Sequence, residues 1–190
     1  MESQFHWINE PAEWRVENNV LQMITGANTD FWRDTWYGFT RFSGHCYATE
    51  TAGDFTFQVK VRADFSALYD QAGIMLMADE RHWLKAGIEY NDGAPAIGSV
   101  LTLGRSDWAT GVFPGDARCF WLRLTRKGDA LRLQYSTDGA RWPLLRLCPF
   151  PAGNVKVGVM CCTPERGGLA VAFEEMQLTP PLEKALHDLS

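Results

Sequence analysis

The residues with the clearest chemical potential lie in one stretch of the chain, residues 71–93, which reads QAGIMLMADERHWLKAGIEYNDG. If this stretch is extended, its side chains alternate between two faces, and Gln71, Met75, Lys85 and Glu89 fall on the same face. An amide, an ammonium group and a carboxylate beside an apolar thioether could bind the hydroxyl groups of a small molecule. We therefore predict that this face binds a ligand.

The opposite face of the same stretch indicates what positions these groups. Residues 71–77 and 83–90 predict two strands joined by a polar turn, and their second face carries Ile74, Leu76 and Ile88. Large aliphatic side chains repeating with a period of two are typical of the buried face of a sheet. We expect that face to pack into a core.

Four further side chains could complete the ligand site. Trp36 lies in an aromatic-rich loop, and His45 follows that loop closely in the sequence. Trp121 and Arg123 share one face of a strand predicted at residues 119–125, where they could supply a stacking ring and a hydrogen-bond donor. We predict that all four converge with the first group on one concave surface.

The aromatic loop, residues 26–39, reads GANTDFWRDTWYGF and has two interpretations. Loops usually lie on the surface, so this many rings in one loop calls for an explanation. The loop could fold over one end of the domain and bury its rings. Alternatively, Trp36 or Trp32 could line a pocket, with Arg33 and Asp34 nearby.

Motifs for catalysis are missing from the sequence. A retaining glycosidase needs two carboxyl groups about 5–5.5 Å apart. Glu89 has no second carboxyl group on its predicted face; it shares that face with Lys85, and the two could simply be a pair of solvated charges. There is no GxSxG motif, and the four histidines lack metal-ligand spacing. We predict no catalytic residues, although a sugar-active hydrolase or isomerase stays open as an alternative.

Composition narrows the class of protein. The chain has 190 residues, 46% of them hydrophobic, with eight tryptophans and a net charge of −5, which suits a single domain and disfavours nucleic acid as a partner. No apolar run approaches a membrane span, and the first residues do not read as a signal peptide. Five cysteines without a CxxC pair indicate reduced thiols in the cytoplasm and no zinc site. We expect no cofactor; calcium is possible, but no motif supports it.

The remaining pattern is all-β. Ten to twelve short strands, separated by Gly, Asp and Asn turns, predict an antiparallel β-sandwich. The domain is expected to span residues 1–190, with a core at about 18–180 and a short extension at 181–190 that could form one or two turns of helix. Besides those given above, strands are predicted at residues 20–25, 55–62, 97–103, 130–136, 155–161 and 169–178, whereas the Trp108 region is expected to be a loop.

Three segments carry a resemblance to a known family. TDFWRDTWYGF, AGIMLMADERHWLKAGIEYNDG and WLRLTRKGDALRLQYSTDGARW resemble, in this order, the regulation-of-enolase-like family of unknown function, in the concanavalin A-like lectin/glucanase superfamily. The resemblance covers about residues 20–178. It implies a jelly-roll sandwich of two sheets, one of them concave, whose concave face commonly holds carbohydrate in the superfamily. Enzymes of the superfamily usually carry an ExDxE-like run, which is absent here, so no catalytic residue is carried over.

Two functions follow as hypotheses. The first is a cytoplasmic carbohydrate-binding or carbohydrate-associated protein, in which sugar faces stack on Trp36 or Trp121 while the polar groups bind hydroxyls. The second is an interaction or regulatory module that binds another protein such as a metabolic enzyme, because an aromatic surface with Met and Arg also suits a protein interface.

Overall fold

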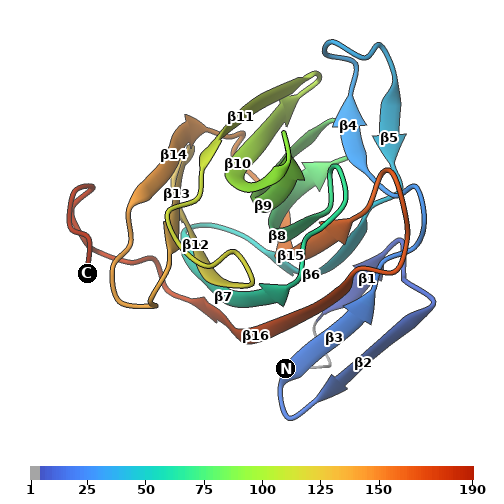
Figure 1. Ribbon diagram of the computed structural model, residues 1–190. Helices are drawn as coiled ribbons and strands as arrows, with labels where there is room; N and C mark the ends of the chain where they lie inside the picture. The colour runs from blue at the N-terminus through green and yellow to red at the C-terminus, as the bar shows by residue number, and fades with distance from the viewer. Residues whose placement is uncertain (1–4) are drawn as a thin grey trace.

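The computed structural model describes residues 5–190, which form sixteen β-strands in three antiparallel sheets (Figure 1). The first sheet contains, in spatial order, β1 (His6–Ile8), β6 (His45–Thr51), β15 (Val155–Cys162), β8 (Gln71–Asp79), β9 (His82–Asn91), β10 (Ala94–Leu103) and β11 (Ser106–Val112). The second contains β14 (Leu144–Pro149), β13 (Ala130–Ser136), β12 (Cys119–Lys127), β7 (Phe55–Ala63), β16 (Ala170–Thr179), β3 (Val20–Ile24) and β2 (Glu13–Glu17). A small hairpin joins β4 (Phe31–Arg33) to β5 (Thr40–Phe42).

The two large sheets stack face to face and enclose one hydrophobic core. Ile74, Leu76 and Ile88 of the first sheet lie in this core with Val59 and Phe173 of the second, all with exposed fractions of 1% or less. The predicted all-β sandwich is therefore confirmed, and so is the inward face of residues 71–90. The alternation that predicted it reflects the period of a strand with one buried face.

The strands that the sequence pattern missed lack that alternation. Every residue of β11 after Ser106 is exposed, so this edge strand carries no buried face for a pattern to reveal. The strands β4 and β5 have three residues each, too few for a period to emerge. The helix expected near the C-terminal end is wrong: the described residues contain no helix, and residues 182–190 run as an irregular segment. Accordingly, no helix able to cross a membrane occurs in the described chain.

The β4–β5 hairpin covers part of the outer face of the first sheet, as its position beside β8, β9 and β15 in Figure 1 indicates. Phe31 and Trp32 of the hairpin form a second apolar cluster with Met75, Trp83 and Met160. This contact explains why the outer face of β8 and β9 is apolar at one end although it is not part of the main core.

Glycines leave another part of this outer face bare. Gly73 on β8, Gly87 on β9 and Gly98 on β10 lie directly opposite one another across the three strands. A Cβ atom on Gly73 would lie 1.9 Å from the Ala86 carbonyl oxygen of the neighbouring strand, so no side chain fits there. The main chain itself forms the surface between Lys85 and Glu89.

Candidate functional site

A cavity of about 690 Å³ opens on the outer face of the first sheet, next to the β4–β5 hairpin. Its volume falls in the range of small-molecule sites. Strands β8, β9, β10 and β11 supply part of its lining, and the hairpin with Ser43 after it and the loops around residues 28–30, 69 and 164–165 supply the rest. The lining residues with polar or aromatic groups are Asn28, Asp30, Trp32, Tyr37, Phe39, Arg41, Ser43, Tyr69, Gln71, Lys85, Glu89, Trp108 and Glu165.

An ion pair lies at the inner end of this cavity. The Lys85 ammonium lies 3.2 Å from Asp30 Oδ1, and the two side chains are only 4% and 17% exposed. Burial alone would lower the pKa of Lys85, but the surrounding negative groups, led by the Asp30 carboxylate and including Glu89, together outweigh burial, so the pKa is raised. Asp30 Oδ1 also accepts the Phe31 main-chain N–H at 2.8 Å, while Asp30 Oδ2 has no hydrogen-bond partner among residues 5–190. That oxygen is free to accept a hydrogen bond from a ligand.

Glu89 presents a second carboxyl group to the cavity. It lies opposite Gln71 across β8 and β9, and its one hydrogen bond within residues 5–190 comes from Asn91 Nδ2 at 3.5 Å. Burial raises the pKa of Glu89 above its ordinary value, with Lys85 acting in the opposite direction. A desolvated carboxyl group with so few partners costs stability, which is typical of groups kept for binding or chemistry.

Aromatic rings form the walls. Trp32 and Trp108 meet edge to face with ring centroids 6.4 Å apart, and the Tyr37 and Tyr69 hydroxyl groups lie 2.9 Å apart. The hydrogen bond with Tyr37, followed by burial, raises the pKa of Tyr69 to about 12, so this phenol stays neutral near pH 7. The cavity therefore combines flat apolar surfaces with neutral hydroxyls and charged groups.

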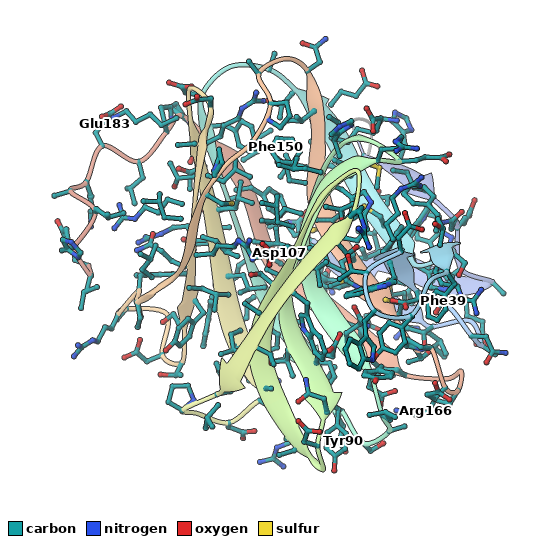
Figure 2. All side chains as sticks on the ribbon, turned by 90° about the horizontal axis from the view of Figure 1, so that it is seen from above. Phe39, Tyr90, Asp107, Phe150, Arg166 and Glu183 are labelled. Atoms are coloured by element: carbon teal, nitrogen blue, oxygen red, sulfur yellow. The ribbon has the colours of Figure 1, made fainter. Side chains whose placement is uncertain are left out.

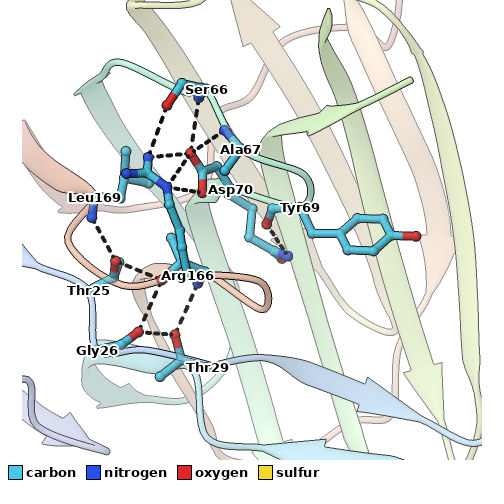
Figure 3. Close-up of polar contacts among 11 residues, drawn as sticks. Thr25, Gly26, Thr29, Ser66, Ala67, Tyr69, Asp70, Arg166 and Leu169 are labelled. Atoms are coloured by element: carbon cyan, nitrogen blue, oxygen red, sulfur yellow. Dashed lines mark hydrogen bonds and ion pairs between the residues drawn. The ribbon is translucent and has the colours of Figure 1, made fainter. Parts of the chain in front are cut away.

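A buried ion pair next to the cavity holds the loop that carries Tyr69 (Figure 3). Asp70 is fully buried, and its carboxylate accepts the Arg166 guanidinium, with Nε 3.0 Å from Oδ1. The main-chain N–H groups of Ser66 and Ala67 also donate to Asp70, at 3.0 Å each. Because Asp70 directly precedes Gln71 and follows Tyr69, this network positions two lining residues.

The structure brings together three of the eight residues predicted to bind a ligand. Gln71, Lys85 and Glu89 all line the cavity. Met75 lies on the same face, as expected, but it is fully buried beneath the hairpin in the apolar cluster and offers no surface to a ligand. The prediction of contact is wrong for Met75, because the hairpin covers that end of the face.

Trp36 and His45 take other positions. Trp36 is at the turn of the hairpin, 93% exposed and in the left-handed region at φ 65°, and it does not line the cavity. Both interpretations of the aromatic loop hold in part. Phe31 and Trp32 are buried, as the first interpretation expects, and Trp32 also lines the cavity, as the second expects. His45 is buried; its Nε2 accepts the Gly26 N–H at 2.9 Å, so Nδ1 carries the hydrogen that it donates to the Asn9 carbonyl. The His45 ring therefore links the main chain at Gly26 to that at Asn9, and both of its nitrogens are used in this structural role.

The expected convergence fails for Trp121 and Arg123. Both lie on β12, which belongs to the second sheet, and their side chains project from its outer face. The Trp121 indole N–H donates to Glu175 at 3.1 Å, and Arg123 Nε donates to Gln134 at 3.1 Å. Two outer faces of a sandwich point in opposite directions, so these residues cannot share a surface with Lys85.

Sequence reasoning missed most of the residues that complete the cavity. Asp30, Tyr69, Trp108 and Glu165 come from loops or an exposed edge strand, where no periodicity marks them. The one available signal was the density of aromatic residues around Asp30. No group of three His, Cys, Asp or Glu side chains suited to a metal ion occurs within residues 5–190.

Replacing Glu89 by glutamine is expected to stabilise the protein relative to wild type, and this difference in the free energy of unfolding should increase with pH. Because the folded-state pKa of Glu89 is raised, the wild-type protein loses stability as pH rises from the unfolded value of about 4.3 through the folded value. The variant does not ionise there, so its advantage should be small at pH 4 and grow as pH rises to 8. Urea unfolding at pH 4 and pH 8 measures it; an equal difference at both values would contradict the assignment.

Comparison with known proteins gives one family. A family model described as "Protein of unknown function (DUF1349)" matches residues 7–181. "Regulation of enolase protein 1" of Saccharomyces cerevisiae is 54% identical over 189 residues, which cover 99% of this chain and 96% of that protein. This finding confirms the resemblance noted in the sequence.

Solved structures share the fold. The crystal structure of a functionally unknown protein from Saccharomyces cerevisiae has a TM-score of 0.93 and 53% identity, covering 95% of this chain and 98% of that one. The carbohydrate-binding module CBM66 from Bacillus subtilis has a TM-score of 0.55 and 13% identity, covering 91% and 94%. The second likeness concerns the fold alone, which is a jelly-roll sandwich.

Proposed function

The chain belongs to the family described as "Protein of unknown function (DUF1349)", and we propose that it binds a carbohydrate or a carbohydrate derivative in the cavity beside the β4–β5 hairpin. One observation carries the proposal: Asp30 and Glu89 present carboxylate oxygens without partners to a cavity that also has aromatic walls. Sugars offer this combination, since their hydroxyls donate to carboxylates and their C–H faces pack on rings.

Further features support the same ligand class. Lys85 and Gln71 add hydrogen-bond donors on the same outer face of β8 and β9. Gly87 has no side chain, which leaves room for a ligand between Lys85 and Glu89. The fold itself serves as a carbohydrate-binding module in Bacillus subtilis. The Tyr69 hydroxyl, neutral near pH 7, can donate or accept.

The test is a calorimetric titration of the purified protein with monosaccharides, oligosaccharides and sugar phosphates, preceded by a thermal-shift screen. We expect saturable binding of one sugar class that Trp108→Ala weakens by about twofold to tenfold, as loss of one stacking ring costs about 0.5–1.5 kcal/mol. The matched control is Trp121→Ala, which removes the same side chain from the other sheet and should leave binding unchanged. Equal loss in both variants, or no binding by any sugar, would refute the proposal.

The same set of sugars also tests the alternative of a sugar-active hydrolase or isomerase. Chromatography of the sugars after prolonged incubation with the protein would reveal new products. Release of products that disappears in Glu89→Gln would favour turnover over simple binding.

A second candidate function is regulation of enolase through direct protein contact. The relative that is 54% identical carries this role in its name. The observation that favours a protein interface is Trp36, whose indole is 93% exposed on a backbone in the left-handed region. An exposed tryptophan in a strained turn costs free energy, and tryptophan is a frequent anchor in protein interfaces.

Replacing Trp36 by alanine is expected to abolish capture of purified enolase by the immobilised protein without lowering its melting temperature. Trp14→Ala, which alters a partly exposed indole on β2, serves as the control and should retain capture. If wild type and Trp36→Ala capture enolase equally, this interface is excluded.

A cytoplasmic location is also part of the proposal. The five cysteines, all of them free thiols, support it. Cell fractionation tests it.

A further inference from the structure

Two arginines lie buried on the outer face of the second sheet, away from the cavity. Arg123 on β12 and Arg132 on β13 are 6% and 8% exposed. Arg123 lies opposite Gln134, and Arg132 lies opposite Thr125, so the two guanidinium groups are diagonal neighbours across two paired strands. Like charges at such close quarters repel each other, and burial adds to the cost.

Most hydrogen bonds of these arginines go to neutral groups, and those of Arg132 all do. Arg132 donates from Nη1 to the Lys184 carbonyl at 3.1 Å and from Nη2 to the carbonyls of Leu186 and Asp188, at 2.9 and 3.1 Å. Arg123 donates to the Gln134 amide and to the main-chain oxygen of Ser190, at 3.1 and 3.4 Å. The remaining donor, Arg132 Nε, is buried and has no partner.

No Asp or Glu side chain among residues 5–190 forms an ion pair with either arginine, although the charge of Asp188 acts to raise the pKa of Arg123. Within the described chain, no Asp or Glu carboxylate lies within 4.0 Å of a nitrogen of either guanidinium group. Burial, followed by the charge of Arg132, lowers the pKa of Arg123 to about 10. Arg123 also packs over the Trp142 ring, 4.2 Å from its centroid. Such a site holds two buried cations without an Asp or Glu side chain against either guanidinium group, and it leaves Arg132 Nε without a partner.

The segment that covers this pair is held lightly. Residues 182–190 form neither helix nor strand, and Leu182, Leu186 and Leu189 are half-buried. Apart from the arginine contacts, the segment is attached by the Leu182 N–H to Thr56 Oγ1, by the Trp142 N–H to the Leu189 carbonyl and by an exposed pair between Lys127 and Glu183. Glu183 marks this side of the molecule in Figure 2, opposite the hairpin residue Phe39. Segments with few buried contacts open at low cost.

We propose that Arg123 and Arg132 form an anion-binding site that takes a carboxylate or phosphate group, and that this anion displaces the covering segment 182–190. Hydrogen bonds from guanidinium to an oxyanion are roughly twice as strong as those to a neutral carbonyl, and they are often bidentate. Arg132 Nε is the donor that a bidentate anion would satisfy. Binding at this site is independent of the cavity on the first sheet.

The test is hydrogen exchange of the full-length protein, followed by mass spectrometry of peptides that cover residues 182–190. Inorganic phosphate and succinate serve as the two probes, each compared with chloride at the same ionic strength. We expect at least one of the two oxyanions to accelerate hydrogen exchange in this segment, with an effect that saturates as its concentration rises. Chloride should leave the exchange rate unchanged. A response to phosphate alone assigns a phosphate site, and a response to succinate alone assigns a carboxylate site.

Variants locate the response. Arg123→Gln should abolish the saturable effect of the oxyanion, and Arg123→Lys, which keeps the charge, should retain part of it if Arg123→Gln does not fold. Arg146→Gln is the matched control, because Arg146 lies on the adjacent strand β14 and already pairs with Asp107 at 3.1 Å. Acceleration no greater than with chloride, or an undiminished response in Arg123→Gln, would overturn the proposal.

Discussion

Replacing Asp30 by asparagine is expected to lower the free energy of unfolding by about 3 kcal/mol, because it leaves the buried Lys85 ammonium without its counter-ion. The asparagine keeps nearly the shape of the carboxylate and can still accept the Phe31 N–H, so the loss reports the charge. Lys85 is 4% exposed in its side chain and Asp30 17%, so water cannot readily replace either partner. Urea unfolding at pH 7 measures the change.

A double-mutant cycle separates the pair from its surroundings. Lys85→Met removes the cation and keeps an unbranched side chain, and the double variant Asp30→Asn/Lys85→Met should be less destabilised than the sum of the two single variants. Additive losses would show that the two groups do not stabilise each other. Sugar binding should fall in each variant if the proposed function is correct.

Replacing Arg166 by methionine is expected to cost about 3–5 kcal/mol at pH 7, because it leaves the Asp70 carboxylate buried with only main-chain partners. Asp70 is fully buried, and Arg166 is its one cationic partner within the described chain. Arg118→Met is the matched control. Arg118 and Asp116 form a similar pair, 2.8 Å apart, but both are exposed, so stability should hardly change.

The same pair predicts acid sensitivity. Burial raises the pKa of Asp70, but the hydrogen bonds from Arg166, Ser66 and Ala67 outweigh burial and hold the pKa below its usual value. The stability that Asp70 contributes is therefore present above the unfolded value of about 3.9 and is lost as pH falls through the lower folded value. Arg166→Met should lose this contribution, so the gap between the two proteins should narrow from pH 7 to pH 3. A constant gap would contradict this account.

The sequence predicted well what depends on local alternation. Residues 71–77 and 83–90 became β8 and β9 with the expected inward face, because Ile74, Leu76 and Ile88 repeat with the period of a strand. For the same reason Gln71, Lys85 and Glu89 were placed on one surface. Alternation within one hairpin is enough to fix these relations.

What the sequence could not predict depends on contacts between distant segments. Asp30 meets Lys85 across 55 positions of the chain, and nothing in its local pattern distinguishes it from other loop aspartates. Trp121 alternates as regularly as Lys85, but alternation does not say to which sheet a strand belongs. The pairing of β12 with β7 and β13 moved Trp121 and Arg123 to the opposite side of the molecule.

The order of strands in the two sheets has a consequence for the speed of folding. The strand β6 pairs with β15, and β7 with β16, so both sheets need partners that lie about a hundred residues apart in the chain. Chains rich in such distant pairings fold slowly, because the entropy of closing large loops is lost before the contacts form. The cavity joins loops around residues 30, 69 and 165 to the first sheet, so it is complete only after the long-range pairing of that sheet has formed. During synthesis, a ligand for this cavity can stabilise the finished protein but cannot guide its early folding.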